Sequence, residues 1–170
     1  MTEEFIKEFL NQSIIRIDQN TPKIIKCLNE LGEEEIWQRP NPASNSVGNL
    51  ILHLCGNITQ YIISSLGEIP DVRERDKEFS AKEGYSRSEL INMLTSTVEK
   101  AKGIIQNMNA EKLLRKRSVQ GFLSSGMGNI IQVTEHYSYH TGQIAFWVKL
   151  LKEKDLNFYG GIDLNKKNMD

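Results

Sequence analysis

The sequence contains three histidines, and all three lie in segments where helices are expected. His136 and His140 are four residues apart, so on a helix their side chains share one face, with Cβ atoms about 5–6 Å apart. That separation lets two imidazole nitrogens reach one cation at about 2.0–2.1 Å each. His53 lies on a different expected helix and can supply a third nitrogen. The pattern therefore predicts a divalent-metal site built from His53, His136 and His140.

A purely structural role for these histidines is also open. A single histidine on a helix is more often a hydrogen-bonded core or surface residue than a ligand, and the HxxxH spacing is easily met by chance. The combination favours metal binding, because no histidine lies in the charge-rich segments and the core of a helix bundle is an established place for metals.

Other metal and catalytic motifs do not fit the sequence. The segment from His136 to His140 has no glutamate after its first histidine, which excludes the HExxH signature of metalloproteases. A di-iron carboxylate centre needs inward glutamates and Glu-x-x-His pairs, which the histidine-bearing helices do not supply. Glu135 lies about 100° around the helix from His136, so we expect it to support the site or the fold rather than bind an ion. Cys27 and Cys55 lack the CxxC spacing of a zinc knuckle.

Helical periodicity predicts the elements that position these side chains, and no clear strand alternation is visible. The expected helices are Thr2–Leu31, Ser46–Leu66, Ser86–Met108 and Gly126–Glu153. Pro22 is expected to kink the first helix, whereas Ser46 and the Ser86–Glu89 capping box mark the starts of the second and third. Four long amphipathic helices with long connections predict an all-α four-helix bundle, and the length predicts a single domain over residues 1–170.

Charge is distributed unevenly along the chain. No Asp, Glu, Lys or Arg occurs from Ser46 to Gly67, and Glu135 is the only one from Ser118 to Val148. Helices without a charged face are normally buried on most sides. A single bundle cannot easily cover two of its helices in this way. The sequence therefore predicts a homodimer.

Overall composition excludes several classes of partner. The 21 Lys and Arg residues balance 22 Asp and Glu residues, for a net charge of -1, which argues against nucleic-acid binding and against attraction to anionic membranes. No run of 18 apolar residues is present, so no membrane span is expected. The acidic N-terminus without an apolar segment and the few cysteines predict a cytoplasmic protein.

Three stretches resemble proteins of the DinB-like (DinB/YfiT) superfamily. Residues 45–57, NSVGNLILHLCGN, resemble the NSxGNLxxHLxGN signature of a subfamily without an assigned function. Residues 136–144, HYSYHTGQI, resemble its HxxxHxGQI signature, and residues 71–79, DVRERDKEF, resemble its RxRxxEF connection. The resemblance implies a four-helix bundle, commonly dimeric, with a divalent metal on the same three histidines.

The resemblance also implies a class of chemistry. Characterised relatives include bacillithiol S-transferases and mycothiol-dependent enzymes, which use the metal to activate a thiol. We therefore expect a metal-dependent S-transferase that joins a small-molecule thiol to an electrophile, with zinc as the first candidate metal and nickel, iron or manganese as others. The alternatives are a non-catalytic metal-binding module of a stress response and a helical interaction module whose histidines only form hydrogen bonds.

Polar side chains near the histidines are candidates for binding the cosubstrate. The candidates are Asn49, Asn57, Gln143, Arg73 and Arg75. Together with Gln132, the amides are expected to orient ligands, although hydrogen bonds between the two helices would also satisfy them. The two arginines are expected to bind a carboxylate or phosphate, and the alternative for them is a solvated network of ion pairs with neighbouring acidic residues.

Overall fold

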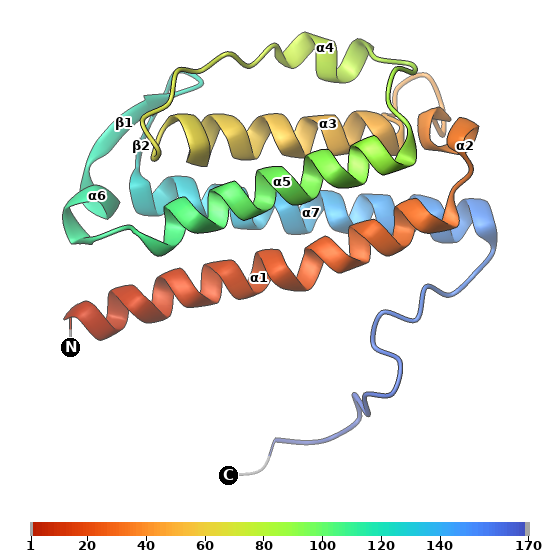
Figure 1. Ribbon diagram of the computed structural model, residues 1–170. Coiled ribbons are helices and arrows are strands. Elements are labelled where there is room, and N and C mark those ends of the chain that lie inside the picture. The colour runs from red at the N-terminus through yellow and green to blue at the C-terminus, as the bar shows by residue number, and fades with distance from the viewer. Residues whose placement is uncertain (1, 169–170) are drawn as a thin grey trace.

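A bundle of four long helices is the main feature of the computed structural model, which describes residues 2–168 (Figure 1). The long helices are α1 (Thr2–Glu30), α3 (Val47–Ile58), α5 (Arg87–Gln106) and α7 (Gly126–Lys152). Helices α1 and α7 run in one direction, and α3 and α5 run in the opposite direction (Figure 1). The predicted all-α four-helix fold is confirmed.

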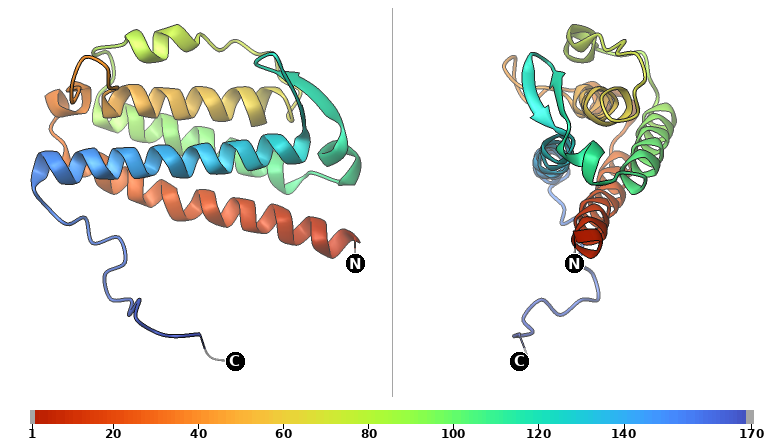
Figure 2. Two further views of the ribbon diagram at one scale, coloured as in Figure 1. Left: turned by 180° about the vertical axis from the view of Figure 1, so that it is seen from behind. Right: turned by 90° about the vertical axis from the view of Figure 1, so that its left-hand side faces the viewer.

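Short elements fill the connections between the long helices. They are α2 (Glu33–Trp37), the π-helix η1 (Thr59–Ser64), α4 (Arg75–Ser80), α6 (Ala110–Leu114), and the antiparallel strands β1 (Lys116–Val119) and β2 (Phe122–Ser125). We refer to residues 65–86, which link η1 to α5 and include α4, as the strap. The strap crosses the outer side of α3, away from α1 (Figures 1 and 2).

Local sequence signals set where the helices begin. The hydroxyl of Ser46 accepts a hydrogen bond from the backbone N–H of Asn49, and the hydroxyl of Ser86 does the same for Glu89. The Glu89 carboxylate in turn accepts from the backbone N–H of Ser86 at 2.8 Å, which completes the predicted capping box. Pro22 lies inside α1 without ending it.

The core lies between the four long helices and consists mainly of branched aliphatic side chains. Buried examples include Ile17, Ile24, Leu28, Ile51, Leu54, Leu90, Leu94, Ile130, Ile144 and Val148. Tyr137 is fully buried as well, and its hydroxyl lies 2.9 Å from that of Thr21, so helices α1 and α7 share a polar contact inside this core.

Two local features depart from the prediction. The second predicted helix, Ser46–Leu66, is α-helical only to Ile58 and continues as η1. The β1–β2 hairpin was not predicted, because its strands are only four residues long. Gln120 and Gly121 form its turn with φ values of 54° and 81°, a turn geometry that matches the twist of paired strands. Within residues 2–168, no helix is long and apolar enough to span a membrane.

Candidate metal centre

The three histidines converge where α3 and α7 lie side by side. His53 comes from α3, His136 and His140 come from α7, and one ring nitrogen of each lies within 4.8 Å of those of the other two. The Nε2 atoms of His53 and His136 are 2.8 Å apart, and the ring centroids of His136 and His140 are 4.4 Å apart. The histidines that were predicted to share a site therefore form one cluster.

Burial keeps the histidines of α7 neutral near pH 7. Burial, together with the neighbouring His140, His53 and arginine side chains, lowers the pKa of His136 to about 4. Burial also lowers the pKa of His140 to about 4, against the opposite effect of its contact with Gln143. A neutral imidazole offers a lone pair, which is the form that binds a metal. His136 and His140 are therefore expected to stay neutral, and able to bind a metal, at a lower pH than ordinary imidazoles.

The hydrogen bond between His140 and Gln143 leaves a nitrogen lone pair of His140 free for a ligand. Nδ1 of His140 lies 2.6 Å from Oε1 of Gln143, so Nδ1–H donates and Nε2 keeps its lone pair. Two Nε2 lone pairs at 2.8 Å repel each other unless a proton or a cation lies between them. This donor set of imidazole nitrogens suits a divalent transition metal such as zinc, nickel or iron.

Glu78 is a functional candidate that the sequence analysis missed. Its carboxylate Oε2 lies 3.0 Å from Nδ1 of His53, and Arg73 contacts both of its carboxylate oxygens. Burial alone would raise the pKa of the Glu78 carboxyl, but the hydrogen bonds from Arg73 and His53 outweigh burial and hold that pKa below its ordinary value. The signal was present as the acidic residue of the RxRxxEF motif, but the sequence alone did not show which of several nearby acids faces a histidine.

The two candidate arginines have different surroundings. The side chain of Arg73 is buried, and each of its three guanidinium nitrogens contacts Glu78 or Gln60. Arg75 is exposed and lies over the ring of Phe79 at 4.7 Å, and it forms no ion pair with any residue that the structure describes. Phe79 in turn packs against the ring of His53, with centroids 4.7 Å apart. Arg75 is therefore the arginine that keeps a free guanidinium near the cluster.

The candidate amides also separate into groups. Asn49 is fully buried, with Nδ2 donating to the carbonyls of Glu78 and Ala81, and Oδ1 accepting from Ser46 and Arg39. These contacts engage both ends of the amide, so Asn49 attaches the strap to α3. Its predicted role in cofactor binding stays a prediction.

The other amides lie closer to the cluster along the helices. Gln143 contacts His140, as described above, and Asn57 is buried one helical turn after His53. Oε1 of Gln132, one turn before His136, is a buried acceptor without a hydrogen-bond partner among residues 2–168. An unpartnered buried acceptor at this place fits a site that receives a polar ligand. The binding roles of these three amides remain predictions.

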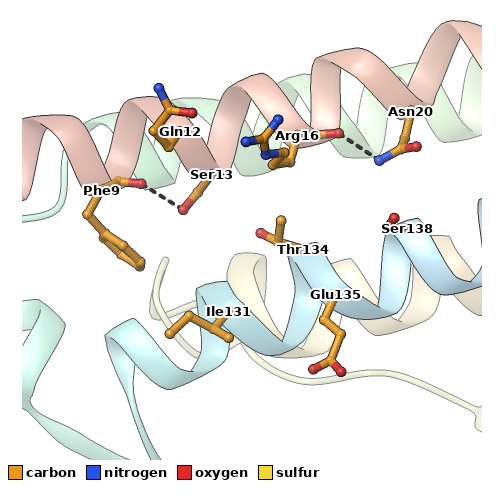
Figure 3. Close-up of a pocket in the computed structure, with 9 residues that line it drawn as sticks. All are labelled: Phe9, Gln12, Ser13, Arg16, Asn20, Ile131, Thr134, Glu135 and Ser138. Atoms are coloured by element: carbon orange, nitrogen blue, oxygen red, sulfur yellow. Dashed lines mark hydrogen bonds between the residues drawn. The ribbon is translucent and has the colours of Figure 1, made fainter. Parts of the chain in front are cut away.

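Glu135 lies in a separate groove. It is exposed on α7 and lines a cavity of about 410 Å³ between α1 and α7, together with Phe9, Arg16 and Ile131 (Figure 3). None of the described hydrogen bonds joins Glu135 to a histidine of the cluster. We expected Glu135 to support either the metal site or the fold. No hydrogen bond to the histidines among the described residues supports the first of these roles.

Solved structures of low sequence identity share this fold. A conserved protein from Enterococcus faecalis aligns with a TM-score of 0.70 at 15% identity, over 85% of this chain and 97% of that one. A DinB-like protein from Bacillus subtilis gives 0.67 at 18% identity, over 87% and 96%. A DinB-like protein from Bacillus cereus gives 0.66 at 17% identity, over 87% and 93%. No curated protein matches the chain.

The helical bundle therefore has the fold of these DinB-like proteins, as the resemblance in the sequence implied. Residues 4–160 match a family described as a protein of unknown function (DUF1572), and the chain belongs to that family. Because this family carries no assigned activity, any function has to be argued from the site.

Proposed function

We propose that this protein binds one divalent metal ion per chain through His53, His136 and His140. The observation that carries the proposal is the convergence of three imidazoles, contributed by two helices, with their ring nitrogens within 4.8 Å of one another. The lowered pKa values of His136 and His140 support it, because both rings are neutral donors at physiological pH. Zinc is the first candidate ion, and nickel, iron and manganese are the others.

The reaction that suits this site is transfer of a small-molecule thiol to an electrophile. Three protein ligands leave room for a further ligand, and a divalent ion there lowers the pKa of a thiol so that it reacts as a thiolate near neutral pH. The chain itself would hold the ion with its imidazoles and orient the ring of His140 through Gln143. Arg75 is the candidate to bind an anionic group of the cosubstrate, because its guanidinium is exposed and free of ion pairs with the described residues.

Metal content after purification from the native host tests the metal site. We expect about one divalent ion per chain, and we expect the double variant His136→Ala/His140→Ala to contain none. Glu135→Gln is the control, since Glu135 lies on α7 next to His136 but faces a separate groove. Equal metal content in the wild-type protein and the double variant would refute the site.

A thiol-conjugation screen with the metal-loaded and chelated protein tests the reaction. Metal-dependent transfer supports the S-transferase. Metal binding without transfer to any electrophile supports a non-catalytic metal-binding module, and the absence of both supports a helical interaction module. The screen covers cytoplasmic thiols, in line with the predicted location and with the free, buried state of Cys27 and Cys55.

We also propose that the protein is a homodimer in solution. The support is an apolar strip on the outer side of α7, where Tyr139, Phe146 and Leu150 are 60%, 70% and 59% exposed. In a single copy this strip is exposed to water, and a second copy of the chain would cover it. Sedimentation analysis should give the mass of a dimer for the wild-type protein and that of a monomer for Phe146→Glu.

A further inference from the structure

The strap places a buried carboxylate and a buried guanidinium directly behind His53. We infer that Glu78 and Arg73 form a positioning pair, which fixes the ring orientation and the tautomer of His53 so that Nε2 faces the other two histidines. The effect of this pair on metal binding rests on the proposed function, whereas its effect on the tautomer of His53 does not. It assigns Arg73 a role other than binding a cosubstrate.

The geometry of the pair is that of a bidentate ion pair. Nε of Arg73 lies 2.7 Å from Oε1 of Glu78, and Nη2 lies 2.8 Å from Oε2. The same Oε2 is 3.0 Å from Nδ1 of His53. The side chains of Arg73, Glu78 and His53 are only 3%, 9% and 8% exposed, so water does not compete for these contacts. A bidentate pair of this kind holds a carboxylate in one plane.

The contacts also select one tautomer of His53. A carboxylate oxygen only accepts hydrogen bonds, so the close contact requires the proton on Nδ1. Nη2 of Arg73 is 3.2 Å from the same Nδ1, but it donates to Glu78, because a protonated Nδ1 has no lone pair to offer. The lone pair of His53 therefore resides on Nε2, the atom that lies 2.8 Å from His136.

Gly56 leaves the space that the pair occupies. Gly56 lies one turn after His53 on α3, and a Cβ atom built there would overlap the Glu78 carboxylate and come within 2.9 Å of Nε of Arg73. Any other residue would push the carboxylate away from the imidazole. The strap backbone is also attached at Glu78 and just after it, since Asn49 donates to the carbonyls of Glu78 and Ala81, and Arg39 to that of Phe79.

A simpler alternative is that the ion pair only attaches the strap to α3. That alternative does not require any particular tautomer of His53. Measuring the tautomer therefore distinguishes a positioning pair from an ion pair that only attaches the strap. In known metal sites, loss of the group that orients a ligand histidine typically weakens metal binding by about 10–100-fold. An ion pair that acts on the strap alone would leave the affinity of a folded variant unchanged.

The experiment measures ring-nitrogen NMR shifts of the metal-free protein and its zinc affinity by competition with a chelator. In the wild-type protein we expect His53 as the Nδ1–H tautomer. In Glu78→Gln we expect a mixed or Nε2–H tautomer and roughly 10-fold or greater loss of zinc affinity. Gly56→Ala, which displaces the carboxylate without removing it, should act in the same direction. Gly103→Ala is the matched control, because a Cβ there meets nothing within 4 Å.

The outcomes of this experiment are separable. An unchanged tautomer and unchanged zinc affinity in folded Glu78→Gln and Gly56→Ala would overturn the positioning pair. If Glu78→Gln does not fold, as judged by circular dichroism, the wild-type protein still decides, since an Nε2–H tautomer of His53 would contradict the inference. If the wild-type protein binds no zinc or other divalent metal, the proposed function fails, and the NMR measurement tests the positioning of His53 on its own.

Discussion

The two helices that supply the histidines hold them in different ways. On α7, helical spacing alone brings His136 and His140 together, and the partner of His140 is Gln143 on the same helix. On α3, the partner of His53 is Glu78, which lies 25 residues away on the strap. The α7 side of the cluster is therefore complete once one helix forms, whereas the α3 side also depends on how the strap folds back.

The side chains that support the histidines are also buried to different extents on the two sides. Glu78 and Arg73 are buried behind His53, whereas Gln143 is exposed. Water can replace an exposed hydrogen-bond acceptor at little cost, but a buried donor that loses its acceptor costs about 1–3 kcal/mol. The α3 side should therefore be the more sensitive of the two to substitution.

The largest effect is expected when the strap is detached from α3 by Asn49→Ala. The substitution leaves the carbonyls of Glu78 and Ala81 without their donor and removes the acceptor for Ser46. At about 1–3 kcal/mol for each buried group left unpaired, we expect the free energy of unfolding to fall by about 3 kcal/mol in urea titrations. Zinc affinity should fall as well, because Glu78 moves with the strap.

Asn107→Ala is the control for this substitution. The side chain of Asn107 donates to the carbonyl of Gly103 at an exposed place on the surface, so we expect a loss below about 1 kcal/mol. A loss of similar size in both variants would mean that the strap is not a special support of the α3 side.

Those parts of the molecule that depend on local spacing could be predicted from the sequence. The HxxxH pair needs only a helix, and the caps at Ser46 and Ser86 need only neighbours three residues away. The fold class follows from helical periodicity in four segments. The third histidine was found because the chain has only three, so few combinations had to be considered.

Contacts between distant segments could not be predicted in the same way. Arg73, Arg75 and Glu78 all lie in one charged stretch, and only the path of the strap decides which of them is buried. Asn49 belongs to the same polar strip as the candidate ligands, yet its NH2 group donates to the backbone of the strap and its oxygen accepts from Ser46 and Arg39. Burial of a polar group is decided by partners far away in the sequence, so periodicity cannot show it.

A second, smaller effect is expected from pH on the metal-free protein. The pKa of His136 and that of His140 are about 4 in the folded state, against the ordinary 6.5. Between pH 6.5 and 4 the unfolded chain binds more protons than the folded chain, so stability falls as pH decreases through this window. We expect a loss of about 2 kcal/mol from the two histidines together between pH 7 and about pH 5.7, measured by urea unfolding in the presence of a chelator.

The double variant His136→Gln/His140→Gln should show a shallower pH dependence over the same window, because the two groups that take up protons are gone. Equal slopes in the wild-type protein and the double variant would mean that the α7 histidines behave as ordinary exposed imidazoles in the folded protein.

The smallest effect is expected from Gln143→Leu on the α7 side. The substitution removes the acceptor for Nδ1–H of His140, but Gln143 is exposed, so water can take its place, and the helix still sets the position of the ring. We expect a loss of zinc affinity of about 3-fold or less, against roughly 10-fold or more for Glu78→Gln, in the same competition assay. Glu135→Gln should leave the affinity unchanged. If Gln143→Leu weakens binding as much as Glu78→Gln does, support within one helix matters as much as support from the strap, and the proposed difference between the two sides is wrong.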